Sequence, residues 1–108
     1  MNQSTADYAD IFANELETWR TNGAQLIDVR EPYEYARGHV PGAQNIPLGK
    51  IANVAPILEG AVVLICASGG RSSHAAQYLA TQGKADITNL AGGTFGYAQS
   101  GLPLESRM

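Results

Sequence analysis

The only cysteine of the chain ends an apolar run and precedes a glycine-rich segment, in the stretch "VVLICASGGRSS" at residues 62–73. A cysteine after such a run is most often a small buried hydrophobe. Here two glycines let the backbone curl, so that successive N–H groups can point inward as an anion-binding nest. The start of a following helix and Arg71 add positive potential. These features favour the thiolate and predict that Cys66 is a nucleophile for an electrophilic sulfur or phosphorus centre.

The two histidines are the other candidates for chemistry. His74 falls just inside the predicted helix, so we expect an exposed helix residue and not a base. His39, in "RGHVPG", is expected to be a hydrogen-bonding loop residue. One cysteine and two histidines are too few for a common structural zinc site.

The segments around Cys66 alternate between strand and helix signals, which predicts the α/β fold class. Strands are expected at 24–30, 61–66 and 85–90, and the middle one is a continuous apolar run typical of a parallel strand covered on both faces. A parallel strand followed tightly by a helix places the Cys66 loop at the carboxyl edge of the sheet, where ligand sites concentrate. That helix is predicted to begin with a Ser72 or Ser73 cap.

The first twenty residues carry a helical pattern. Apolar side chains between residues 8 and 19 recur at spacings of three and four, which predicts an amphipathic helix. Ser4 or Thr5 would cap this helix, and Phe12 and Trp19 are expected in the core.

Weaker signals fill the rest of the chain. Residues 31–47 contain three prolines and two glycines and predict turns around a short strand at 43–46. Residues 48–58 predict a weak helix interrupted by Pro56, and residues 95–99 predict a short one.

Composition limits the classes of function. At 108 residues the chain is expected to form one domain over residues 1–108, with 44% hydrophobic and 16% charged residues. The net charge of −3 and the lack of a basic run argue against a nucleic-acid partner. The longest apolar run, "AVVLICA", is too short to span a bilayer, and the first residues do not resemble a signal peptide. A single cysteine fits a reducing compartment, and we expect the cytoplasm.

Three segments, in order, resemble the rhodanese (sulfurtransferase) domain family in its small single-domain form. They are "LIDVREPYEYARGHVPGAQNIP", "CASGGRS" and "LAGGTFGYAQSGLPLE", and the resemblance covers about residues 24–105. It implies a rhodanese-like, five-stranded, mostly parallel sheet flanked by helices on both faces. It also implies that Cys66 accepts a sulfane sulfur as a persulfide and passes it to a thiophilic acceptor such as cyanide or a thiol. No metal or cofactor is implied.

The resemblance also assigns roles around the nucleophile. A small sulfur-containing substrate, such as thiosulfate or a persulfide, would be held by the loop residues Ala67, Ser68, Gly69, Gly70, Arg71 and Ser72. A sulfur-acceptor protein is a further candidate partner.

Asp28 and Arg30 end the first predicted strand on the same edge. A surface ion pair would be worth little there, but the resemblance implies that these two residues brace the site through hydrogen bonds.

Two departures from the family pattern concern the donor and the packing. Tyr97 stands where the family usually has tryptophan, which is a change in packing. Ala67 follows the cysteine where members that favour thiosulfate often carry a cation, and this leaves the physiological donor open.

Two other functions are weighed against the sulfurtransferase. Rhodanese-like domains also serve as non-catalytic binding or regulatory modules, commonly without the cysteine, and the presence of Cys66 argues for chemistry. Phosphatases of related fold place five residues between cysteine and arginine, whereas this loop has four. The smaller loop suits a sulfur relay better than a phosphate with four peripheral oxygens, so a phosphatase is disfavoured.

Overall fold

A single five-stranded sheet forms the centre of the protein. The computed structural model describes residues 7–106, and all strand pairs of the sheet are parallel, in the order β1-β5-β4-β2-β3. The strands are β1 (Ala9–Ile11), β2 (Gln25–Asp28), β3 (Gln44–Asn45), β4 (Val62–Ile65) and β5 (Ile87–Leu90). The helices are α1 (Leu16–Thr21), α2 (Pro32–Arg37), α3 (Ile51–Val54), α4 (Gly70–Thr81) and α5 (Gly93–Gln99), with 3₁₀ turns at Ala13–Glu15, Leu48–Lys50 and Ala55–Ile57.

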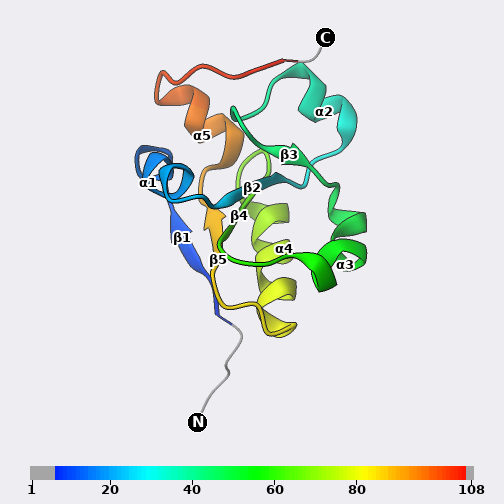
Figure 1. Cartoon of the computed structure of the whole chain (residues 1–108). Coiled ribbons are helices and arrows are strands. Elements are labelled where there is room, and N and C mark those ends of the chain that lie inside the picture. Colours follow the sequence, from blue (N-terminus) through cyan, green and yellow to red (C-terminus); the bar gives the residue numbers. More distant parts are fainter. Residues whose placement is uncertain (1–6, 107–108) are drawn as a thin grey trace.

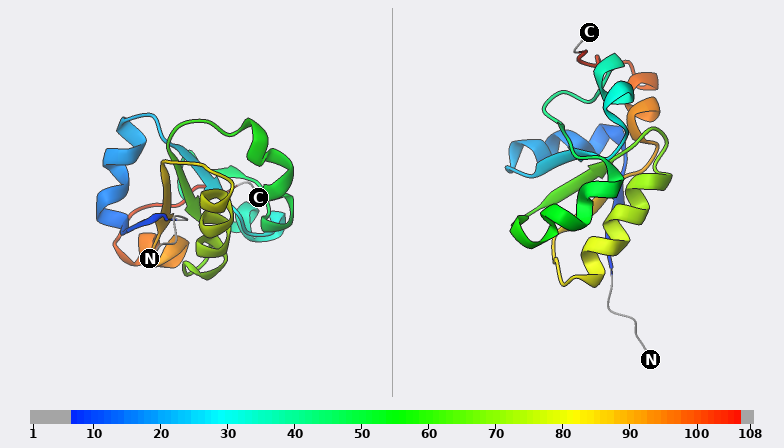
Figure 2. Two further views of the ribbon diagram at one scale, coloured as in Figure 1. Left: turned by 90° about the horizontal axis from the view of Figure 1, so that it is seen from below. Right: turned by 90° about the vertical axis from the view of Figure 1, so that its right-hand side faces the viewer.

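Helices cover both faces of the sheet, as the sequence predicted. Figures 1 and 2 show α3 and α4 on one side of the strands and α1 and α5 on the other. Side chains of β4 and of Cys66, which follows it, alternate between the two layers, so that Val62, Leu64 and Cys66 pack in one core and Val63 and Ile65 in the other. Every residue of β4 is buried, which explains its apolar sequence without alternation.

The prediction of a helix over residues 8–19 is wrong in its first half. Ala9–Ile11 form the edge strand β1, which pairs with β5, and only Leu16–Thr21 are α-helical. Spacing alone could not reveal this, because pairing with a distant strand overrides a local helical period. Phe12, expected in the core, is 58% exposed, whereas Trp19 packs partly buried against the second core. The suggested caps Ser4 and Thr5 lie outside the described residues.

Two helix starts also differ from expectation. Residues 32–37, predicted as turns, form α2, which has Pro32 in its first turn and Glu34 folded back on the backbone N–H of Glu31. α4 begins at Gly70 with Gly69 as its N-cap, so Ser72 lies inside the helix and neither Ser72 nor Ser73 is the cap. Within residues 7–106, no helix combines the length and apolar character needed to cross a membrane.

Candidate active site

The loop between β4 and α4 holds Cys66 at the carboxyl edge of the sheet, in a central position. β4 ends at Ile65 between β2 and β5, and Gly69 takes a φ of +110° that turns the chain directly into α4. A side chain at Gly69 would be strained in this conformation and would approach the backbone N of Gly92 at 3.3 Å. The glycine therefore allows the tight turn that directs the helix start toward the cysteine.

Donors converge on the Cys66 sulfur. The residue is only 1% exposed, the backbone N of Gly69 donates to Sγ at 3.1 Å, and the Ser72 hydroxyl oxygen lies 3.3 Å from Sγ. Burial by itself raises the pKa of the Cys66 thiol, but the Ser72 hydroxyl and the backbone N–H groups of Ser72, Gly69 and Ser68 more than offset it. The net pKa is lowered from the ordinary thiol value of 9.0, so the loop favours the thiolate.

A second turn supports the loop from behind. Thr94 donates both its backbone N–H and its hydroxyl to the Cys66 carbonyl, at 2.8 and 3.0 Å, and the N–H of Phe95 donates to the Ala67 carbonyl at 3.0 Å. A Cβ at Gly93 would stand 2.5 Å from the Cys66 carbonyl oxygen, so only glycine permits this approach. Sequence reasoning did not assign Gly93 or Thr94 to the site, although both lie in the third segment of the family resemblance.

Arg71 has a partner that the sequence analysis did not identify. Its guanidinium forms a two-pronged ion pair with Glu34 of α2, at 2.8 and 2.9 Å. This pairing lowers the pKa of Glu34 to about 2, mainly through the hydrogen bond from Arg71, and raises the pKa of Arg71 above its usual value. The Arg71 side chain is 40% exposed beside the loop, and Glu34 compensates its charge within the protein.

Asp28 and Arg30 form a buried pair beside the loop. Asp28 is fully buried and Arg30 is 4% exposed, so the surface ion pair is ruled out. The Arg30 guanidinium donates to both Asp28 carboxylate oxygens, at 2.8–3.1 Å, and to the Gly38 carbonyl at 2.8 Å. Asn45 adds donors to the carbonyls of Asp28 and Arg30. These bonds tie the end of β2 to the C-terminal end of α2 and to β3.

The two histidines lie where the simpler interpretation placed them. His74 is exposed on α4. His39 is buried, and its Nδ1 lies 2.7 Å from the carbonyl oxygen of Tyr35, whose ring stacks on the imidazole. The hydrogen bonds to the Cys66 sulfur come from Gly69 and Ser72, and neither histidine takes part in them.

A groove opens beside the loop. It has a volume of about 290 Å³, and Ala67 forms part of its wall together with Arg30, Glu34, Phe95 and Leu104. Phe95 is 62% exposed and gives the groove an apolar wall, and the Glu34 carboxylate in the groove is paired with Arg71.

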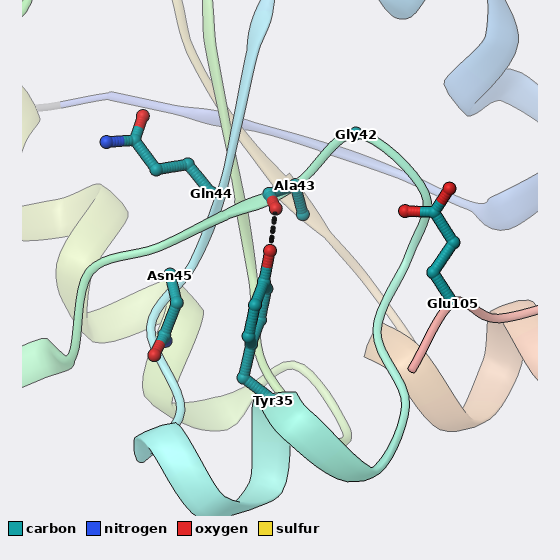
Figure 3. Close-up of a pocket in the computed structure, with 6 residues that line it drawn as sticks. All are labelled: Tyr35, Gly42, Ala43, Gln44, Asn45 and Glu105. Atoms are coloured by element: carbon teal, nitrogen blue, oxygen red, sulfur yellow. Dashed lines mark hydrogen bonds between the residues drawn. The ribbon is translucent and has the colours of Figure 1, made fainter. Parts of the chain in front are cut away.

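A larger surface pocket, of about 440 Å³, lies at the β3 edge of the sheet. Figure 3 shows the Tyr35 hydroxyl pointing at the Ala43 carbonyl, to which it donates, with Glu105 across the pocket. Asn45, also in its wall, has both donor hydrogens committed to backbone carbonyls. No residue of the Cys66 loop lines this pocket, which is therefore separate from the thiol.

Comparisons with known proteins agree on one family. The profile of the rhodanese-like domain matches residues 10–100. A thiosulfate sulfurtransferase GlpE of Pseudomonas aeruginosa is 35% identical over 85 residues, which cover 77% of each chain. A protein named sulfurtransferase from Allochromatium vinosum is 38% identical over 86 residues, covering 78% of this chain and 80% of that one.

Solved structures give the same result. A rhodanese-related protein from Thermoplasma volcanium superimposes with a TM-score of 0.81 at 31% identity, over 91% of this chain and 98% of its own. A rhodanese-like domain protein from Staphylococcus aureus gives 0.78 at 29% identity, over 93% and 99% of the two chains. With its α/β fold and the matched profile, the chain belongs to the rhodanese-like domain family.

Proposed function

We propose that the protein is a rhodanese-type sulfurtransferase that carries sulfur as a persulfide on Cys66. The observation that carries this proposal is the convergence of the Gly69 N–H and the Ser72 hydroxyl on a thiol at the carboxyl edge of the sheet. The relatives named thiosulfate sulfurtransferase and sulfurtransferase support the reaction class.

The proposed reaction has two displacement steps. The Cys66 thiolate attacks the outer sulfur of the donor, a bond forms between the two sulfurs, and the donor's own bond to that sulfur breaks. With thiosulfate, sulfite leaves with the electron pair and Cys66 becomes a persulfide. A nucleophile such as cyanide or a thiolate then attacks the outer sulfur, takes it as thiocyanate or a new persulfide, and releases the Cys66 thiolate.

The loop can stabilise negative charge on sulfur in both steps. Negative charge resides on sulfur before the attack, on the terminal sulfur of the persulfide, and again on Cys66 after release. Backbone N–H groups that already point at Sγ can stabilise the Cys66 thiolate before the attack and after release without rearrangement. A nearly buried thiol also suits a donor that delivers a single outer sulfur atom. A small sulfur compound is therefore the proposed substrate, with a sulfur-acceptor protein as a further candidate.

A mass measurement tests the proposal. After brief exposure to a sulfane donor and removal of the excess, the protein should gain the mass of one sulfur atom and lose it again on addition of cyanide. A non-catalytic binding module would gain no sulfur. A reducing compartment such as the cytoplasm would keep the thiol available between cycles.

Arg71 and Glu34 should tune the preference for donor charge. Arg71→Ala leaves the Glu34 carboxylate uncompensated beside the loop, so kcat/KM for thiosulfate should fall by about tenfold, and by less for an uncharged sulfane donor. Glu34→Gln leaves the Arg71 charge uncompensated and should raise kcat/KM for thiosulfate.

The Glu34 pKa of about 2 lies below its usual 4.5, so the pair with Arg71 contributes stability above pH 4.5 and loses it as the pH falls toward 2. Assays near neutral pH therefore compare intact pairs.

The matched control is Glu59→Gln, which removes the same charge from the exposed segment before β4, away from the carboxyl edge. This substitution should leave kcat/KM unchanged for both donors. An equal loss for both donors in Arg71→Ala would instead assign Arg71 to ordering of the loop alone.

A further inference from the structure

The Ser72 hydroxyl lies between two groups that can accept its hydrogen. Its oxygen is 3.3 Å from the Cys66 sulfur and 2.6 Å from Oδ1 of Asn89, a residue of β5. All three residues are buried, with exposed fractions of 1% for Cys66, 0% for Ser72 and 4% for Asn89. A serine hydroxyl has one hydrogen, so it cannot donate to both partners at once.

The surroundings fix which end of the Asn89 amide faces Ser72. Nδ2 of Asn89 donates to the Asp10 carboxylate at 3.0 Å and lies 3.5 Å from the Gly69 carbonyl oxygen. Both of these neighbours are acceptors only, and Asp10 stands directly opposite Asn89 in the pairing of β1 with β5. The donor end of the amide must therefore face them, and the acceptor end must face Ser72.

We infer that Asn89 is a positioning residue that competes with the Cys66 sulfur for the hydroxyl hydrogen of Ser72. In the thiol state, Cys66 can donate to the Ser72 oxygen while Ser72 donates to Asn89, and every group is satisfied. In the thiolate state, the sulfur only accepts, and it receives the Ser72 hydrogen only if Asn89 Oδ1 loses its buried partner. Asn89 therefore favours the thiol and opposes the backbone donors of the loop.

Such opposition has a chemical use. The nucleophilicity of a thiolate falls as its pKa falls, and the best attacking thiol has a pKa near the ambient pH. If nothing opposed the anion-binding loop, the pKa of Cys66 would fall far, and the thiolate would be highly populated but weakly reactive. The Asp10–Asn89–Ser72 chain of hydrogen bonds opposes the loop and keeps the pKa of Cys66 from falling too far. This inference rests on the proposed role of Cys66 as nucleophile.

Charged groups near the sulfur do not give the same effect. Among residues 7–106, they include Arg71 with its partner Glu34, Asp28 with its partner Arg30, Asp10 on β1, and Arg37 in the groove beside Ala67. Their Coulomb effects on Cys66 do not require the Ser72 hydroxyl, whereas the proposed competition does. Removal of that hydroxyl therefore separates the two causes.

A double-mutant cycle tests the inference, with the midpoint of the pH profile for alkylation by iodoacetamide as the readout. Cys66 is the only cysteine, so the signal reports one thiol. Asn89→Leu should lower the Cys66 pKa by about one unit, because a hydrogen bond to a charged group becomes fully available. In a Ser72→Ala background, the same Asn89→Leu change should leave the pKa where Ser72→Ala puts it.

A second variant guards against a failure of Asn89→Leu to fold. Asp10→Ala removes an exposed partner, lets the amide turn, and should lower the pKa by a smaller amount that also shrinks when Ser72 is alanine. A pKa shift that is unchanged in the Ser72→Ala background would assign the effect to Coulomb forces and overturn the inference, as would a raised pKa in Asn89→Leu. Because alkylation requires no sulfur transfer, this result stands apart from the test of the proposed reaction.

Discussion

Cys66→Ser should retain the fold and lose sulfur transfer by about 10⁴-fold or more, the usual scale for removal of a catalytic nucleophile. Serine is close to cysteine in size, so the core around Cys66 keeps its volume. A hydroxyl remains protonated at neutral pH and forms no persulfide, so both steps of the proposed reaction lose their carrier. The measurement is the steady-state rate of thiocyanate formation from thiosulfate and cyanide, with thermal unfolding recorded for both proteins.

Ser68→Ala is the matched control for this prediction. Ser68 is exposed in the same loop, and its contribution to Cys66 is a backbone N–H that the substitution leaves in place. It should therefore keep most of the transfer activity. Substantial turnover by Cys66→Ser would refute the assignment of Cys66 as carrier, and failure of the parent protein to take up sulfur would favour a binding module.

The sheet could be predicted largely from local sequence, because its central strands are short, apolar and separated by clear turn signals. β2, β4 and β5 fall inside the segments predicted for them, at residues 24–30, 61–66 and 85–90. The edge strand β1 could not be found in this way, since its three residues become a strand only by pairing with β5. The helix α2 carried a recognisable start, with Pro32 in its first turn and Glu34 three residues after the cap, but the prolines and glycines of the surrounding segment 31–47 suggested turns.

The site was predictable where one continuous segment builds it and was missed where distant segments meet. Cys66 and its loop are adjacent in sequence, so their juxtaposition needed no fold. Glu34 reaches Arg71 from 37 residues away and Asn89 reaches Ser72 from 17, and only the tertiary structure brings them together. Asn89 did leave one signal, because a polar amide within the buried strand "ITNL" needs a buried partner.

Asp28→Ala should lower the free energy of unfolding by about 3–5 kcal/mol, because it leaves the Arg30 guanidinium buried without its counter-charge. It also removes the acceptor of the Arg30 backbone N–H, at 3.0 Å, so the turn after β2 loses a second bond. The measurement is chemical denaturation of parent and variant. Asp86→Ala, an exposed carboxylate just before β5, is the control for loss of one acidic charge and should unfold like the parent.

Activity distinguishes bracing from catalysis in this variant. The side-chain hydrogen bonds of Asp28 end on Arg30, and within residues 7–106 neither residue hydrogen-bonds to the Cys66 sulfur. Under conditions where Asp28→Ala is still folded, its kcat/KM should therefore fall far less than that of Cys66→Ser. Asp28→Ala combined with Arg30→Leu should recover part of the lost stability, because no unpaired charge remains buried, although the Gly38 carbonyl loses its donor. An Asp28→Ala protein that unfolds like the parent but has lost its activity would place Asp28 among the catalytic residues and contradict the bracing role.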